Sequence, residues 1–335
     1  MNLISTYIKA PFLFRILLLV SLCSISLQTV QADDWVRIAD LNGKWKFTIG
    51  DNEEWAAKEF DDSYWDKINA PEMWEHQGFH GYNGFAWYRK KVYIPKNLIS
   101  RDLYLVLGYI DDVDEVYLNG ELIGRSGSFP PQYTTAYRAL RKYPIPLELL
   151  QPGKECVIAV RVYDSHQQGG MVSGDLGIFA TRMNIVPALD LRGLWKFKKG
   201  NSYNWKDTDY SDKNWDEIMV PDPWEHQGYW KYDGLAWYRK TFVFPENMDT
   251  RNLAVVIGKI DDFDQVYLNG EYIGSTNDGR PYGRSQSYNQ MRVYLIPEEF
   301  LRKGEPNVIS VKVKDIGNIG GIYEGPIGLF YTKDL

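Results

Sequence analysis

The side chains that could do chemistry in this sequence begin with two pairs of adjacent acids, Asp111-Asp112 and Asp261-Asp262. A retaining glycosidase needs two carboxylates that face each other across a glycosidic bond, one as acid and base and the other as nucleophile. Each acid pair here precedes an Asn-Gly dipeptide, which is typical of a tight hairpin turn. We therefore expect these acids to form turns, or ion pairs with Arg89 and Arg239, rather than to catalyse hydrolysis.

Other catalytic and metal-binding patterns are missing from the sequence. His76 and His226 occupy equivalent positions, whereas His80 and His166 have no counterparts, so no paired zinc motif is formed. There is no nucleophile elbow, phosphate-binding loop or dinucleotide fingerprint. From these patterns we assign no catalytic residue, no metal site and no cofactor.

Tryptophans and arginines near the acids have the chemistry that binds sugars. Proteins hold sugars by stacking aromatic rings on their CH faces and by bonding their hydroxyl groups to acids, amides and arginines. Trp74 and Trp224 follow proline-led segments, so we expect both indole rings to be exposed. Arg89 and Arg239 lie in the matching segments Ala-Trp-Tyr-Arg-Lys. We predict these four residues as sugar-binding candidates, and the alternative is that such side chains pack in a core or pair strands.

The elements that position these residues form a two-fold repeat. Aligning the sequence with itself matches Pro71-Glu-Met-Trp-Glu-His-Gln-Gly to Pro221-Asp-Pro-Trp-Glu-His-Gln-Gly. Within each copy the apolar residues alternate over short runs, and an Asn-Gly dipeptide separates two of them, which predicts strands and hairpins. The runs are 101–108, 115–119, 156–162, 253–257, 265–268 and 308–313. We expect an all-β chain of two tandem antiparallel β-sandwiches, with domains at 33–187 and 188–335 and a core in each.

The N-terminal segment 1–32 has the pattern of a signal peptide, with basic residues before an apolar run and a small residue, Ala32, at its end. We expect export to the periplasm or the extracellular space, with no membrane-spanning segment after cleavage. Cys156 would then be the only cysteine, a buried bystander without a disulfide partner. The net charge of -6 without a long basic run argues against nucleic-acid binding.

The order of motifs in both copies resembles the jelly-roll, galactose-binding-like domain that opens the family-two glycoside hydrolases, the β-galactosidases and β-glucuronidases. These motifs are Trp-x-Phe, Pro-x-x-Trp-Glu, Ala-Trp-Tyr-Arg-Lys and Asp-Asp-x-Asp-x-Val-Tyr-Leu-Asn-Gly, and together they run through nearly all of both copies. In that family a TIM barrel supplies both catalytic carboxylates, and no part of this sequence resembles the barrel.

The resemblance implies a site in the glycine-rich loop after the penultimate strand, which faces the sugar in that family. By this match Asp164 and Asp315 would contact a sugar, and the paired glycines that follow would let the backbone approach it. Copy two keeps Gly325-Pro326, as the family does, whereas copy one has Gly174-Asp175. Asp315 and Tyr323 are therefore the better candidates, and segment 274–288 is expected to flank them.

The resemblance implies a carbohydrate-binding protein whose partner is a glycan or oligosaccharide, and we expect it to be exported, from the signal-peptide pattern, and non-catalytic, since no segment resembles the barrel. One alternative is a glycoside hydrolase, or a fragment of one that acts with a separately encoded barrel or partner enzyme. Another alternative is a ligand-sensing or scaffolding module without sugar affinity. The identity of the sugar is left open.

Overall fold

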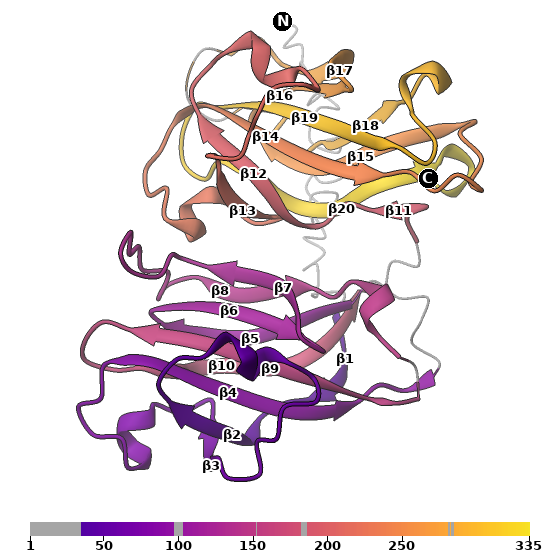
Figure 1. Cartoon of the computed structure of the whole chain (residues 1–335). Helices are drawn as coiled ribbons and strands as arrows, with labels where there is room; N and C mark the ends of the chain where they lie inside the picture. Colours follow the sequence, from indigo (N-terminus) through magenta and orange to yellow (C-terminus); the bar gives the residue numbers. More distant parts are fainter. Residues whose placement is uncertain (1–34, 97–102, 152, 182–185, 281, 283–284) are drawn as a thin grey trace, which may run out of the picture. The chain divides into compact units, whose positions relative to one another are not determined.

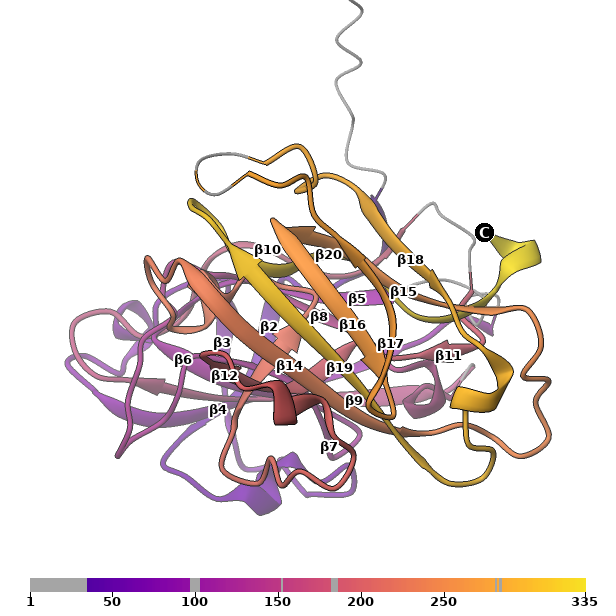
Figure 2. The same ribbon diagram turned by 90° about the horizontal axis from the view of Figure 1, so that it is seen from above.

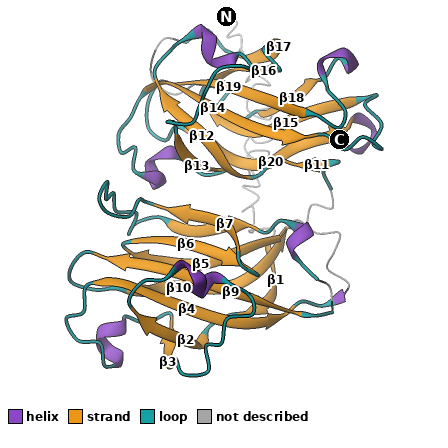
Figure 3. Ribbon diagram, viewed as in Figure 1, coloured by secondary structure: helices purple, strands orange, loops and turns teal. Residues whose placement is uncertain are grey.

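The computed structural model describes residues 35–96, 103–151, 153–181, 186–280, 282 and 285–335. The predicted signal peptide, residues 1–32, lies outside the described residues. The described part is all-β, as predicted, and its helices are single short turns (Figure 3). None of these turns is long and apolar enough to cross a membrane.

The first copy forms a sandwich of two antiparallel sheets, whose strands are labelled in Figure 1. The strands are β1 (Trp35–Asp40), β2 (Gly43–Ile49), β3 (Asp66–Ala70), β4 (Gly84–Tyr93), β5 (Leu103–Asp111), β6 (Val113–Leu118), β7 (Glu121–Ser126), β8 (Leu140–Pro144), β9 (Glu155–Asp164) and β10 (Gly170–Thr181). The strand order is β1-β10-β5-β8 in one sheet and β3-β2-β4-β9-β6-β7 in the other.

The second copy repeats this arrangement strand for strand. Its strands are β11 (Leu189–Asp190), β12 (Gly193–Lys199), β13 (Asp216–Val220), β14 (Gly234–Val243), β15 (Leu253–Asp261), β16 (Phe263–Leu268), β17 (Glu271–Thr276), β18 (Met291–Leu295), β19 (Pro306–Asp315) and β20 (Gly321–Tyr331). The strand order is β11-β20-β15-β18 in one sheet and β13-β12-β14-β19-β16-β17 in the other. Figure 2 shows β14, β19 and β16 side by side.

Each sandwich buries a core made from both of its sheets. Alternate side chains of a strand point to opposite faces of the sheet. Val311 and Val313 of β19 therefore share a face, and they pack in one buried cluster with Val255 and Ile257 of β15. The other face of the six-stranded sheet carries a smaller aromatic cluster that includes Trp237. The alternation expected from the sequence thus separates a core face from an aromatic outer face.

The predicted hairpin turns are confirmed. Asn119 and Gly120 have φ values of 53° and 95°, and Asn269 and Gly270 have φ values of 52° and 86°. Two successive residues with positive φ form the type I′ turn that matches the twist of the flanking strands, and Asn-Gly tolerates this conformation best. These turns join β6 to β7 and β16 to β17.

The predicted domain boundary, between residues 187 and 188, lies between the last strand of the first sandwich and the first strand of the second. β10 ends at Thr181 and β11 begins at Leu189. Cys156 is free and buried, as expected. Its counterpart Asn307 is also buried and bonds to Arg302 and Asn269. Independent folding of each copy stays a prediction.

Candidate functional site

The acids singled out in the sequence gather at one end of each sandwich because of strand register. In the second sandwich Asp261, at the end of β15, pairs with Gly321 of β20. Asp315, at the end of β19, pairs with Gly234 of β14. The corresponding pairs in the first sandwich are Asp111 with Gly170 and Asp164 with Gly84. The antiparallel ladders therefore bring acids from distant parts of the chain to the same edge.

The exposure expected for Trp74 and Trp224 is wrong, because both indole rings are fully buried. Trp224 begins the short helix η6 (Trp224–Gln227), and its Nε1 donates to the carbonyl oxygen of Tyr232 at 3.1 Å. A Cβ atom on Gly320 would overlap the Trp224 ring, so the glycine-rich loop lies directly against the indole. Trp74 is covered by Gly169 in the same way. Neither ring offers a face to a ligand.

The motif Trp-Glu-His-Gln instead holds the glycine-rich loop in place. The backbone nitrogen of Gly320 donates to Glu225 Oε2 at 2.9 Å, and the nitrogen of Trp224 donates to the Gly320 carbonyl at 3.2 Å. The Gln227 side chain bonds both the nitrogen and the carbonyl oxygen of Met219 in β13. The motif is therefore a clamp between the loop and the sheet.

Arg89 and Arg239 are also buried, and they lie on the face of the sheet away from the predicted loop site. Arg239 Nε donates to Asp212 Oδ2 at 2.9 Å, and its other nitrogens donate to backbone carbonyls such as Trp205 O at 2.6 Å. Side chains two residues apart in a strand lie on the same face of the sheet. Arg239 therefore shares the outer face with Trp237, whereas Asp315 lies on the core face with Val313. Arg89 makes the same pairing with Asp62. The predicted ion pairs of these arginines with Asp111-Asp112 and Asp261-Asp262 are therefore wrong.

The arginine that does reach the acidic end was not among the predicted site residues. Arg292 of β18 is buried, and its Nε donates to Asp264 Oδ1 at 2.8 Å. The same guanidinium group donates to the backbone carbonyls of Ile260 at 2.8 Å and Asp262 at 2.7 Å. It thus fixes the turn that carries the acid pair. Two features of the sequence could have identified this arginine. They are the third acid of the Asp-Asp-x-Asp motif and the arginine that is repeated at positions 141 and 292.

Asp315 is almost completely buried and uses only one of its two carboxylate oxygens. Oδ1 accepts a hydrogen bond from Gly317 N at 2.8 Å, which caps the loop, and Oδ2 has no partner among the described residues. Burial raises the pKa of this carboxyl group to about 7. Asp164 repeats the pattern, with His166 N at 3.0 Å, a free Oδ2 and a pKa that burial raises to about 6.

The two adjacent acids of the second sandwich differ in state: Asp261 is neutral, whereas Asp262 is held in a fixed orientation. Burial, together with a hydrogen bond to Asp262, raises the pKa of Asp261 to about 8, so that this group is protonated at neutral pH. Asp262 Oδ2 accepts from Ile316 N at 2.9 Å, which fixes its orientation. A protonated carboxyl group beside a carboxylate can both donate and accept hydrogen bonds.

A pocket of about 440 Å³ opens in front of these acids. It is lined by Pro223, Asp261, Asp262, Tyr288, Gly317, Asn318, Ile319 and Tyr323. The structure therefore places the predicted Tyr323 in the site, where its hydroxyl group donates to Tyr288 O at 2.8 Å. Asp315 does not line the pocket and meets it only through its bond to Gly317. The part of segment 274–288 that the structure describes contributes Tyr288.

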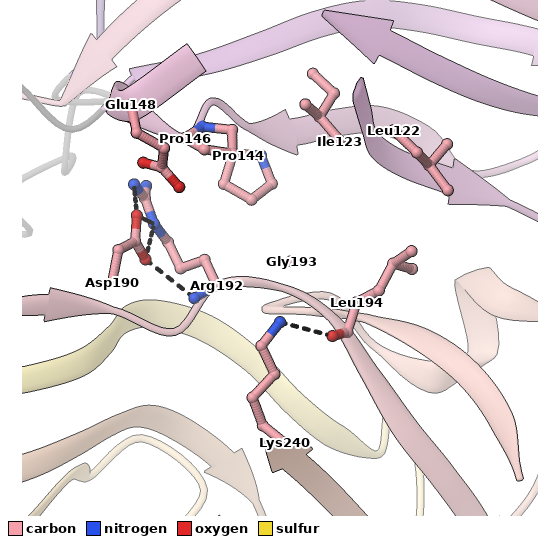
Figure 4. A pocket seen from close by; sticks show the side chains of 10 residues that line it. All are labelled: Leu122, Ile123, Pro144, Pro146, Glu148, Asp190, Arg192, Gly193, Leu194 and Lys240. Carbon is pink, nitrogen blue, oxygen red and sulfur yellow. Dashed lines mark hydrogen bonds and ion pairs between the residues drawn. The ribbon is translucent and has the colours of Figure 1, made fainter. Parts of the chain in front are cut away.

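Among the residues that the structure describes, those that line this pocket include acids but no lysine or arginine. Two basic residues of the second sandwich, Arg192 and Lys240, line a different pocket (Figure 4). There Arg192 pairs with Asp190 at 2.6 Å, and Lys240 Nζ donates to Leu194 O at 2.8 Å. The pocket beside Asp261 is therefore acidic, with tyrosine and isoleucine side chains at its wall.

The raised pKa of Asp315 predicts that the free energy of unfolding falls as pH rises from 3.8 to about 7. In this range the native carboxyl group keeps a proton that the unfolded chain loses, and each such proton gives a slope of about 1.4 kcal/mol per pH unit. Asp315→Asn cannot ionise, so it should make the slope shallower. Urea unfolding at several pH values between 4 and 8 measures both slopes, and equal slopes would contradict the assignment.

Comparison with known proteins identifies relatives of parts of this chain. Residues 201–318 match the family model described as the second all-β domain of β-galactosidase. A β-glucuronidase of Formosa agariphila is 28% identical over 135 residues, which are 36% of this chain and 13% of that protein. A β-galactosidase of Bacteroides ovatus is 30% identical over 138 residues, which are 37% of this chain and 15% of that protein.

The solved structures that are similar to this chain include the crystal structure of a Bacteroides uniformis β-glucuronidase. The two chains are 16% identical, and the aligned region covers 84% of this chain and 27% of the glucuronidase chain. The TM-score of the superposition is 0.37. This chain spans only 13% to 16% of the length of the curated relatives that it matches. The match therefore concerns only a small part of each relative.

Proposed function

We propose that this chain, which consists of all-β domains of the kind found in family-two β-galactosidases and β-glucuronidases, is a non-catalytic carbohydrate-binding protein. Its ligand is a neutral sugar, held in the pocket of the second sandwich. The export predicted from residues 1–32 belongs to the same proposal, since it would bring the chain to glycans outside the cytoplasm.

The observation that supports this function best is the chemistry of the pocket. A volume of about 440 Å³ lies within the range of small-molecule sites, about 300–1,000 Å³. Asp261 and Asp262 offer a donor and several acceptors side by side, as paired sugar hydroxyl groups require. Tyr288 and Tyr323 add ring surface next to them. Hydroxyl-bonding acids beside aromatic rings suit a sugar better than a purely apolar ligand.

The acidic lining favours a neutral sugar over a uronic acid. A uronate would bring a further negative charge next to Asp262, and the described residues that line the pocket include no lysine or arginine to pair with it. Desolvating an unpaired charge is expensive, so the carboxylate of a uronic acid should be rejected. On this basis the selectivity of this chain differs from that expected of a β-glucuronidase such as the Formosa agariphila relative.

We expect methyl galactoside or methyl glucoside to bind the purified chain at least tenfold more tightly than the corresponding methyl uronate. The members of each pair differ only in whether carbon 6 carries a hydroxyl or a carboxylate group. Isothermal titration calorimetry on chain 33–335, guided by a glycan array, measures the ratio. Tighter binding of the uronate would contradict the neutral-sugar proposal. The absence of any glycan ligand would favour the scaffolding alternative.

The chain is expected not to hydrolyse aryl galactosides or aryl glucuronides. Retaining hydrolysis needs two carboxyl groups about 5–5.5 Å apart on either side of the glycosidic bond, whereas Asp261 and Asp262 are neighbours that share a hydrogen bond. The test is release of the aryl group by the purified chain. Turnover that persists through purification and is lost in Asp261→Asn would instead favour the hydrolase alternative.

A further inference from the structure

Three carboxylates converge at the acidic end of the first sandwich. Asp111 ends β5, Asp112 joins β5 to β6, and Asp164 ends β9. Each of the three offers a carboxylate oxygen, and these oxygens all lie within 4.8 Å of one another. We call these three residues the aspartate triad. Among the described residues, the corresponding acids of the second sandwich do not form such a group.

No member of the aspartate triad forms an ion pair with a basic side chain in the part of the chain that the structure describes. The nearby Arg141 is occupied by Asp114, whose Oδ1 it bonds at 2.6 Å, and it meets Asp112 only at the backbone carbonyl, at 2.9 Å. Carboxylates this close repel one another unless a proton or a cation lies among them.

The buried oxygen of Asp164 points independently to a ligand. The Asp164 side chain is fully buried, and its Oδ2 has no hydrogen-bond partner in the described structure. Native proteins rarely leave a buried carboxylate oxygen unpaired, because the loss of its hydration is not compensated. Asp164 comes from a different strand than Asp111 and Asp112, so the fold itself brings this unpaired oxygen to the acid pair.

Asp112 is held as a metal ligand would be. Its Oδ1 accepts from Thr135 Oγ1 at 2.7 Å, and its Oδ2 accepts from Ser165 N and Ser165 Oγ, both at 2.9 Å. Each carboxylate oxygen keeps a second lone pair after one such bond. Hydrogen bonds of this kind orient the ligands of metal sites, so that less conformational entropy is lost when the metal binds.

We propose that Asp111, Asp112 and Asp164 bind one calcium ion. Oxygen-only donors select hard cations such as Ca²⁺ and Mg²⁺. Oxygens on opposite sides of Ca²⁺ lie about 4.6–5.2 Å apart, against about 4.0–4.2 Å around Mg²⁺, by doubling their usual bond lengths. The oxygens of the triad all lie within 4.8 Å of one another, so they are no farther apart than oxygens on opposite sides of one Ca²⁺ ion. Asp111 is partly exposed, which leaves room for the water molecules that complete the coordination.

The ion would join two strand ends that are distant in the sequence. Asp112 follows β5, and Asp164 precedes the loop whose first residue, Ser165, already bonds to Asp112. Calcium would therefore fix this loop in the first sandwich, independently of sugar binding in the second. The spacing of histidines and cysteines could not reveal this site, because the triad contains neither residue type.

Titration of the full chain with CaCl₂ by calorimetry should show one site per chain. The melting temperature should rise by about 5–10 °C when free calcium is a hundred times the dissociation constant. Asp164→Asn and Asp111→Asn should each weaken calcium binding at least tenfold. Asp262→Asn, the matched change in the second sandwich, should keep the full calcium-dependent shift even if its melting temperature without calcium is lower.

The partly exposed position of Asp111 makes Asp111→Asn the variant that is expected to fold normally. Failure to bind calcium at millimolar concentration would overturn the proposal. Unchanged calcium affinity in Asp111→Asn would also overturn it, as would an equal response to MgCl₂ and CaCl₂ at matched ionic strength. A shift that Asp262→Asn abolishes and Asp111→Asn retains would place the ion in the other sandwich and contradict the assignment.

Discussion

Asp264→Asn is expected to lower the free energy of unfolding by about 3–5 kcal/mol, since removing one member of a buried ion pair leaves the other charge unpaired. The Asp264 and Arg292 side chains are both fully buried, and Tyr294 donates a further hydrogen bond to Asp264 Oδ2 at 2.5 Å. The pair connects β16 of one sheet to β18 of the other. Urea unfolding followed by tryptophan fluorescence measures the loss.

The control for this experiment is an ion pair of the same chemistry at the surface. Asp249 and Arg251 lie 2.7 Å apart, but their side chains are 47% and 68% exposed. Asp249→Asn should leave the free energy of unfolding almost unchanged, because water screens exposed pairs. Equal effects of Asp249→Asn and Asp264→Asn would mean that burial of the Asp264 pair does not determine its contribution.

Asp261→Ala is expected to weaken sugar binding at least tenfold without a comparable loss of stability. Asp261 lines the pocket, and as a protonated group at neutral pH it can donate to one sugar hydroxyl and accept from another. A hydrogen bond between neutral groups contributes about 0.5–1.5 kcal/mol, so the loss of two such bonds reaches the roughly 1.4 kcal/mol that corresponds to tenfold in affinity. Calorimetry with the best glycan ligand measures the change. Asp111→Ala, the matched variant in the first sandwich, should leave sugar affinity unchanged.

The companion variant Asp315→Ala separates direct contact from support of the loop. Asp315 Oδ1 caps Gly317, which lines the pocket, and its unpaired Oδ2 is buried. If Asp315 acts by capping, Asp315→Ala lowers the melting temperature together with the affinity. If Oδ2 bonds the sugar, the affinity falls at least tenfold at an unchanged melting temperature. Unchanged affinity with a lower melting temperature would remove Asp315 from the binding site.

The sequence predicted the fold because its signals are local and periodic. Apolar alternation decides which face of a strand is buried, and Asn-Gly permits the positive φ values seen at Asn269 and Gly270. A duplicated pattern of this kind predicts two similar sandwiches without any knowledge of long-range contacts. The all-β class, the hairpins and the buried Cys156 were therefore predictable from the sequence alone.

The site residues were predicted less well because residue type does not show where a side chain points. Trp224 has the chemistry of a sugar platform, but the glycines of a loop distant in the sequence cover it. Arg239 has the chemistry to bond hydroxyl groups, but the two-residue period turns it to the outer face, where Asp212 and backbone carbonyls occupy it. Proximity between distant segments is the information that the sequence pattern lacks.

The sequence by itself therefore determined the two-fold repeat, the strands and turns, and the segments in which acids and glycines lie. Only the tertiary structure decided that Arg292 rather than Arg239 meets the acidic end, and that Asp261 and Tyr323 line a pocket while Asp315 lies behind it. Strand composition follows local rules of alternation and turn geometry. Strand register joins residues far apart in the chain, and here it decides which acids come close enough to bind one ligand.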